Sequence, residues 1–231
     1  MITRIKEALQ KAADPEKAAV LARFFKTGKG QYGQGDVFLG ITVPKQRKIA
    51  KKHSALSWVG IRELLSSPIH EHRLVALLIL IEKHGKSDAT GKEETFAFYM
   101  KNRKQVNNWD LVDLSAGHIV GDYLIDKDRT LLYKMARARN LWERRMAIMA
   151  TFPFIRRGQF DDTLRLAALL LSDSHDLIHK AVGWMLREIG KRDQEKEEAF
   201  LEKHCREMPR TMLRYAIERF DEKKRQAYLK R

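Results

Sequence analysis

The side chains with the clearest chemical potential in this 231-residue sequence are Trp109 and Asp113. They lie four residues apart, and the preceding Asn107 or Asn108 is a favourable residue for capping the start of a helix. On a helix, side chains four apart share one face, so an indole would stand beside a carboxylate. An indole attracts cations, and a carboxylate stabilises developing positive charge or orients a water molecule. The pair therefore suits a substrate or transition state that carries positive charge.

The whole chain carries a large excess of positive charge. Lys and Arg number 45 against 30 Asp and Glu, which gives a formal net charge of +15. Such an excess indicates a polyanionic partner, and nucleic acid is favoured over a membrane because no lipid-seeking segment accompanies it. A basic protein without such a partner is the simpler alternative, because net charge governs association rather than fold.

Cysteine content and hydropathy bear on the compartment. The single cysteine, Cys205, cannot form a disulfide within the chain or a cysteine-based zinc site, which suits a reducing cytosol. Residues 1–7 read as the start of an amphipathic helix without the apolar stretch of a signal peptide. The longest apolar run, residues 74–81, is too short to span a bilayer. We expect a cytoplasmic protein without membrane association.

Helical periodicity extends over almost the whole sequence, and no alternating run predicts a strand. Asp14, Pro15 and Glu16 form a typical helix start signal. Because no linker is long enough to separate domains, residues 1–231 are expected to form a single all-α domain. The predicted helices cover residues 2–13, 15–26, 44–53, 57–66, 69–85, 92–102, 108–125, 129–138, 141–156, 160–171, 175–191, 194–205, 210–219 and 222–230.

Five of these helices contain similar segments at intervals of 34 to 36 residues. Their first residues are Arg73, Trp109, Arg145, Lys180 and Arg214. A period of this length is typical of an α-solenoid built from stacked antiparallel helix pairs of the HEAT type. Because an unpaired cation is costly to bury, four cations at five equivalent positions predict that these positions face outward. They would then form a basic stripe on a concave surface.

The stripe would bring four side chains onto one wall of three neighbouring helices: Trp109, Asp113, Arg145 and Trp184. Each has an ordinary alternative, because tryptophans are usually core residues, while Asp113 could form a salt bridge and Arg145 could be solvated. If they converge, Arg145 suits a phosphate, and Asp113 suits a sugar that develops positive charge. A nucleic acid with a cationic N-alkylated purine fits this set, since the alkylated base leaves without being protonated.

The sequence resembles the AlkD-type DNA alkylation repair proteins, bacterial glycosylases of HEAT-like architecture, over almost its whole length. The likeness rests on residues 38–44 (FLGITVP), 109–113 (WDLVD), 142–145 (WERR) and 180–188 (KAVGWMLRE). The resemblance implies that Asp113 is catalytic, stabilising the positive sugar and positioning water. It also implies that Trp109 and Trp184 hold the deoxyribose of the lesion. Arg145 would hold the DNA backbone near the lesion.

The resemblance also implies DNA contacts outside this set. Arg187 and Lys191 match basic residues that bind phosphates, and Thr42 and Arg47, at the start of the basic helix 44–53, are expected to contact DNA as well. One departure is Phe24, where the best-known members carry a tyrosine.

The expected function is hydrolysis of the N-glycosidic bond of cationic alkylpurines such as 3-methyladenine and 7-methylguanine in double-stranded DNA. Family members leave the damaged base stacked, in contrast to the usual flipping of the target nucleotide. The reaction would leave an abasic site, and we expect a monomer without a metal or other cofactor. Two alternatives stay open. A non-catalytic helical module that binds damaged or structured DNA or RNA needs the basic stripe but not the carboxylate. A protein-binding scaffold would bind DNA weakly and without salt sensitivity.

Three further segments are interpreted more simply. The glycine-rich residues 27–36 form either a flexible connector or a loop whose backbone approaches phosphates, since glycine serves both uses. His70, Glu71 and His72 are expected to be a solvated helix start rather than a metal site, because adjacent residues on a helix do not face each other. The pair formed by His175 and His179 lacks a third local ligand, so no metal is expected there.

Overall fold

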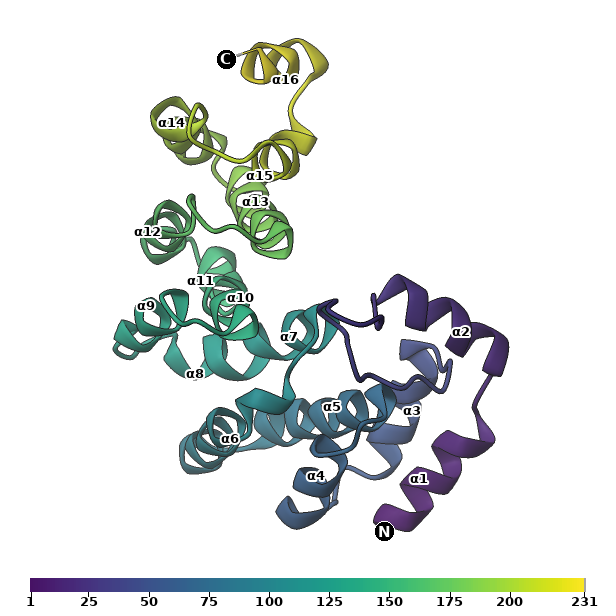
Figure 1. The fold of residues 1–231 in the computed structure, drawn as a ribbon. Helices are drawn as coiled ribbons and strands as arrows, with labels where there is room; N and C mark the ends of the chain where they lie inside the picture. Colours follow the sequence, from purple (N-terminus) through teal and green to yellow (C-terminus); the bar gives the residue numbers. More distant parts are fainter. Residues whose placement is uncertain (231) are drawn as a thin grey trace. The chain divides into compact units, whose positions relative to one another are not determined.

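The structure, a computed structural model, describes residues 1–230 and is predominantly helical (Figure 1). Within these residues the one strand-like pairing is an isolated parallel bridge between Val37 and Ile69. The prediction of an all-α protein with the architecture of an α-solenoid is confirmed. Contacts divide the chain into two compact units, Met1–Ser115 and Ala116–Arg231. That residues 1–231 form one domain stays a prediction, and each unit is described by itself.

The first unit is built around α5 (His70–Lys86), which is buried at every position from His70 to Leu80. A helix that is covered on all sides needs partners for any ionisable residue in its buried part. Helices α3, α4 and α6 pack against α5. The other elements of this unit are α1 (Ile2–Lys11), α2 (Pro15–Phe24), α3 (Val43–Lys52), α4 (Trp58–Leu65), α6 (Ala89–Lys101), the turn η1 (Arg103–Gln105) and α7 (Trp109–Ala116).

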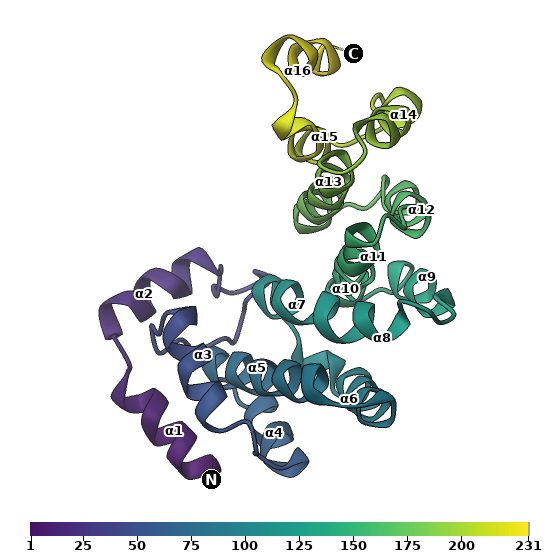
Figure 2. The same ribbon diagram turned by 180° about the vertical axis from the view of Figure 1, so that it is seen from behind.

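Helix α2 lies on the outside of the first unit in both views (Figures 1 and 2) and has no buried residue. Its start follows the predicted signal, with the Asp14 side chain accepting a hydrogen bond from the Lys17 amide and Pro15 in the first turn. Gly40 crosses this start with a φ of +82°, and a Cβ there would lie 2.1 Å from the Asp14 carbonyl oxygen. Glycine therefore allows the chain before α3 to pass against α2.

The second unit is built around α13 (Asp176–Gly190), which packs against α10, α12, α14 and α15. A Cβ at Gly183 would lie 2.4 Å from the Met212 carbonyl oxygen, so glycine allows α15 to approach α13 closely. The elements of this unit are the π-helical turn η2 (Gly117–Gly121), α8 (Asp122–Leu124), α9 (Thr130–Ala136), α10 (Leu141–Met149), α11 (Phe152–Arg156), α12 (Asp161–Leu169), α14 (Gln194–His204), α15 (Arg210–Ala216), the turn η3 (Ile217–Arg219) and α16 (Glu222–Leu229).

Most predicted helices are found with small differences at their ends, and one is divided into two. The predicted helix 92–102 begins earlier, at Ala89, because the Asp88 side chain caps it. The predicted helix 141–156 is instead two helices, α10 and α11, because Pro153 cannot donate the hydrogen bond that a helix interior requires. Within residues 1–230, no helix has both the length and the apolar character needed to cross a bilayer.

Candidate functional site

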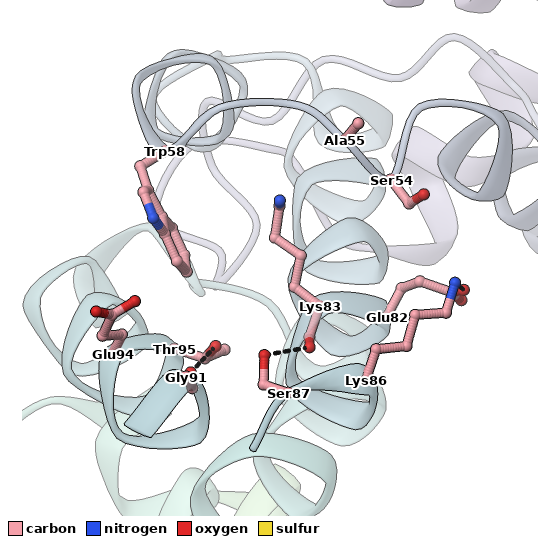
Figure 3. A pocket seen from close by; sticks show the side chains of 10 residues that line it. All are labelled: Ser54, Ala55, Trp58, Glu82, Lys83, Lys86, Ser87, Gly91, Glu94 and Thr95. Carbon is pink, nitrogen blue, oxygen red and sulfur yellow. Dashed lines mark hydrogen bonds and ion pairs between the residues drawn. The ribbon is translucent and has the colours of Figure 1, made fainter. Parts of the chain in front are cut away.

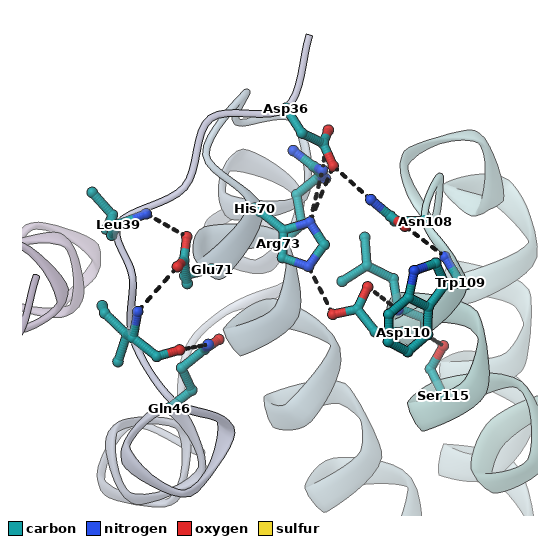
Figure 4. Close-up of polar contacts among 12 residues, drawn as sticks. Asp36, Leu39, Gln46, His70, Glu71, Arg73, Asn108, Trp109, Asp110 and Ser115 are labelled. Atoms are coloured by element: carbon teal, nitrogen blue, oxygen red, sulfur yellow. Dashed lines mark hydrogen bonds and ion pairs between the residues drawn. The ribbon is translucent and has the colours of Figure 1, made fainter. Parts of the chain in front are cut away.

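The start of α7, which carries Trp109 and Asp113, is held by Asn108. The Asn108 side-chain oxygen accepts a hydrogen bond from the Trp109 amide at 2.8 Å. Its side-chain nitrogen donates to the Asp36 carboxylate at 3.0 Å, and Asn108 is fully buried. The predicted asparagine at the helix start is therefore confirmed, and it also ties α7 to the segment before α3 (Figure 4).

His70, at the start of α5, bridges two carboxylates (Figure 4). Its Nδ1 lies 3.1 Å from an Asp36 oxygen and its Nε2 lies 2.8 Å from an Asp110 oxygen. Burial alone would lower the pKa of His70, but the hydrogen bonds to Asp110 and Asp36 outweigh it and raise that pKa to about 9. His70 is therefore a cation at neutral pH. It joins α5 to the first turn of α7.

Arg73 completes this buried cluster. Its guanidinium lies 2.6 Å from the Asp36 carboxylate and donates a second hydrogen bond to the Ser67 carbonyl oxygen. Burial raises the pKa of Asp36, but His70, Arg73 and Asn108 together hold that pKa below its usual value. Two carboxylates and two cations thus meet at the first turn of α7. We call Asp36, His70, Arg73 and Asp110 the ionic cluster.

Glu71, the next residue of α5, anchors the chain before α3. Its carboxylate accepts hydrogen bonds from the backbone amides of Leu39, Gly40 and Ile41 at 2.9 to 3.2 Å. The prediction that His70, Glu71 and His72 form a solvated helix start is wrong, because they are 2 %, 1 % and 6 % exposed. The available signal was their position in front of an otherwise apolar helix, which implies burial with partners.

Aromatic rings fix the orientation of Trp109. Its indole stacks on Phe25, with ring centroids 4.9 Å apart and planes at 11°. Phe25 in turn stacks on Phe38, which stacks on His70. Phe24 is 62 % exposed and meets the indole edge-on at 5.9 Å. Trp109 is half-buried, so it packs on the core while remaining partly accessible.

The predicted catalytic set is divided between the two units. Asp113 is half-buried one helical turn after Trp109, as their spacing predicted, and both belong to the first unit. Arg145, Trp184, Arg187 and Lys191 belong to the second unit. The convergence of the four side chains of the predicted wall therefore stays a prediction.

The prediction that the lead positions of the repeat face outward is wrong for two of them. Arg73 is 3 % exposed and Arg145 is 4 % exposed. Arg73 pairs with Asp36, and the Arg145 guanidinium donates a hydrogen bond to the Leu177 carbonyl oxygen. A cation can be buried when it pairs with a carboxylate or donates to a carbonyl oxygen, and a repeat in the sequence does not reveal such partners. The contact of Arg145 with DNA stays a prediction.

The predicted site residues Trp184, Arg187 and Lys191, on α13 and directly after it, each form a hydrogen bond or an ion pair with a carboxylate. Trp184 is half-buried, and its Nε1 donates to Glu188 at 3.3 Å. Lys191 and Arg192 also donate to Glu188, and Arg187 forms an ion pair with Glu218. Burial raises the pKa of Glu188, but the hydrogen bonds from Lys191 and Arg192 lower it more. This group was not singled out from the sequence.

Helix α3 presents cations in a different way. Thr42 and Arg47, the predicted DNA contacts here, are both exposed. Thr42 precedes the first turn of α3 and its side chain makes no capping hydrogen bond. Five exposed cations of α3 form no ion pair with any of the described residues: Lys45, Arg47, Lys48, Lys51 and Lys52.

Three amides of the glycine-rich loop form hydrogen bonds to nearby residues of the chain. The Gly28 amide donates to the Gln31 side chain at 3.0 Å, and the Gly30 amide donates to the Gln34 side chain at 2.7 Å. The Gly33 amide donates to the Lys26 carbonyl oxygen. Because these amides are satisfied within the loop, the structure favours a connector over a cradle for phosphates.

A separate hollow of about 320 Å³ lies between α4, α5 and α6 (Figure 3). The Lys83 ammonium stands 5.8 Å from the Trp58 ring centroid. The Ser87 and Thr95 hydroxyls donate to the backbone carbonyl oxygens of Lys83 and Gly91. Both hydroxyls are therefore engaged within their own helical segments.

The two histidines of α13 also make local contacts. His175 Nδ1 accepts a hydrogen bond from the Leu177 amide and so caps the helix, and His179 Nε2 contacts the Asp173 carbonyl oxygen. Among residues 1–230, no group of three or more His, Cys, Asp or Glu side chains could hold a metal ion.

Comparisons with known proteins give one family and two solved structures. The family described as DNA alkylation repair enzyme matches residues 5–220. A predicted DNA alkylation repair enzyme from Enterococcus faecalis is 18 % identical, with a TM-score of 0.68 over 91 % of this chain and 97 % of that one. The smu.31 protein from Streptococcus mutans UA159 is 17 % identical, with a TM-score of 0.54 over 89 % of this chain and 100 % of that one. No curated protein sequence matches the chain. At these identities the structures share the fold.

Proposed function

Because the chain belongs to the DNA alkylation repair enzyme family, we propose that it is a DNA glycosylase for cationic N-alkylated purines in duplex DNA. Its substrates would include 3-methyladenine and 7-methylguanine, and its product would be an abasic site. The observation that carries the proposal is that the helix bearing Trp109 and Asp113 is held in a fixed position. The helix that presents them is tied to the core by Asn108 and the ionic cluster, and the indole is held by Phe25. Such fixed geometry is what transition-state stabilisation requires.

The proposed chemistry needs no general acid. When the bond between C1′ and the alkylated base breaks, its electron pair neutralises the positive base, which leaves as a neutral molecule. The sugar becomes positively charged and resembles an oxocarbenium ion. Asp113 would stabilise that charge and orient the water that attacks C1′, and the attacking water loses its proton to solvent. The indole faces of Trp109 and Trp184 would add about 0.5–2 kcal/mol of attraction to the cationic sugar.

The proposed grip on DNA depends on phosphate contacts. The exposed cations of α3 form no ion pair among the described residues, and with Thr42 at the start of the helix they are suited to bind the backbone. Arg145, Arg187 and Lys191 are proposed as further contacts, with the base left stacked in the duplex. We propose that the protein is a cytoplasmic monomer. It would need no metal or organic cofactor, because the substrate carries its own activating charge.

The test is incubation of the purified protein with N-methylated duplex DNA, followed by separation and identification of free bases. We expect release of 3-methyladenine and 7-methylguanine by the wild type, and none by Asp113→Asn. DNA binding without release by the wild type would refute the glycosylase and would favour the alternative, a non-catalytic module for damaged or structured nucleic acid. Weak binding that does not respond to salt would instead favour a protein-binding scaffold.

A further inference from the structure

Glu188 is a buried carboxylate at the centre of a small network on α13. It is 7 % exposed, and one of its oxygens accepts hydrogen bonds from both Trp184 Nε1 and Lys191 Nζ. The other oxygen accepts a hydrogen bond from Arg192 at 3.2 Å. Trp184 is four residues before Glu188, and Lys191 is three after it, so helical geometry alone brings them together.

The network is built to keep Glu188 ionised. A buried carboxylate is costly unless it is paired, and Lys191 and Arg192 supply two cations at the end of the helix, where positive charge is also favoured. An ionised carboxylate is a stronger acceptor for an indole N–H than a neutral group would be. By keeping Glu188 ionised, the two cations maintain the stronger acceptor for the Trp184 indole N–H.

The backbone that carries the Trp184 indole is held closely by α15. The residue before it, Gly183, lies directly against α15, where a Cβ would be 2.4 Å from the Met212 carbonyl oxygen. The backbone at Trp184 is thus held closely, and what remains free is rotation of the side chain. The hydrogen bond from Nε1 to Glu188 restricts that rotation. Because an indole attracts positive charge through its face, its orientation decides whether it can assist a cationic sugar.

We propose that Glu188 is a positioning residue that orients the Trp184 indole for base release, and that Lys191 and Arg192 act through it. The inference depends on the proposed glycosylase function. It gives Lys191 a task besides the predicted phosphate contact, since its ammonium lies on the carboxylate that orients the indole.

Two substitutions separate the acceptor from the charge. Glu188→Gln keeps a side-chain oxygen that can accept from Trp184, and Glu188→Ala removes it. Glu218→Ala is the matched control, because it removes a carboxylate that pairs with a cation of the same helix, Arg187. That ion pair does not include Trp184, whose indole donates to Glu188.

The measurement is the single-turnover rate of 7-methylguanine release at saturating protein, with the DNA dissociation constant determined separately. We expect about a tenfold lower rate for Glu188→Ala, a smaller loss of about threefold for Glu188→Gln, whose neutral oxygen is a weaker acceptor, and an unchanged rate for Glu218→Ala. DNA binding by Glu188→Ala should be equal or tighter, because Lys191 loses a competing carboxylate. An unchanged rate in Glu188→Ala, or an equal loss in Glu218→Ala, overturns the proposal.

A second readout does not need activity. The acrylamide quenching of Trp184 is obtained as the difference between each protein and its Trp184→Phe version, at a temperature below the melting transition of every variant. Glu188→Ala should raise the quenching constant of Trp184, and Glu188→Gln should raise it less, because its side-chain oxygen still accepts from the indole. Quenching that is the same in all variants overturns the positioning role. If the wild type releases no base but quenching changes as expected, the glycosylase fails while the restraint on Trp184 stands.

Discussion

Helix α3 and helix α13, with the residues that follow it, are both basic, but they present their charge differently. The five exposed cations of α3 form no ion pair with any described residue. On α13, Lys180 pairs with Asp176, Arg187 with Glu218, and Lys191 with Glu188. A cation that already has a carboxylate must exchange it to bind a phosphate, so its net gain is smaller. The comparison shows that the net charge of a chain does not locate the charge that is available to DNA.

We propose that both basic regions hold DNA, while the charge of Asp113 on α7 stabilises the reacting sugar. Replacing Asp113 with Asn is the largest test of that division. We expect base release to fall at least about 100-fold, because the positive sugar loses its stabilising charge. Affinity for undamaged duplex should stay within about twofold of wild type, because no phosphate contact is lost. Parallel release and binding assays on the same preparation measure this. Release at the wild-type rate would remove Asp113 from the chemistry.

The ionic cluster adds a third arrangement of charge to the comparison. Its charges are buried, whereas those of α3 are exposed. The folded-state pKa of His70, about 9, lies above its ordinary value of 6.5, so folding favours the protonated form. The stability from His70 is therefore complete below pH 6.5 and is lost as pH rises through 9, and it amounts to roughly 3 kcal/mol at most.

Urea unfolding of the wild type and His70→Gln between pH 6 and pH 10 measures this contribution. The difference in unfolding free energy between the two proteins should shrink as pH rises, which separates His70 from the titration of lysines. It should change little with added salt, because buried pairs are poorly screened. A difference that is constant over this pH range would show that His70 is not a cation in the folded protein.

The direct comparison between the two basic regions has the smallest expected effect. Lys45→Ala combined with Lys48→Ala should weaken duplex binding and lower the slope of log affinity against log salt by up to about 2, since each phosphate contact contributes about 0.9. Lys180→Ala on α13 should leave the slope nearly unchanged, because Lys180 pairs with Asp176. Binding titrations at several salt concentrations measure both slopes. If the slope falls equally for both proteins, the distinction between free and paired cations is irrelevant to DNA binding.

Local sequence signals predicted much of the fold and part of the site. Helix periodicity located the helices, and the cap at Asn108 and the four-residue spacing of Trp109 and Asp113 placed both side chains on one helix. These features depend on residues within a few positions of each other. The failure at Arg73 has a different origin, because its partner Asp36 is 37 residues away.

The sequence by itself determined an all-helical chain with a strong positive charge and an indole next to a carboxylate at the start of α7. Only the tertiary structure decided which charges are buried and which are accessible. The ionic cluster joins Asp36, before α3, to His70 on α5 and, through Asn108, to α7, across separations of 34 and 72 residues. Helical periodicity records which side of a helix is apolar, but the partner of a buried ion is chosen by packing between helices. The same residue type therefore anchors the interior at Arg73 and faces solvent at Arg47.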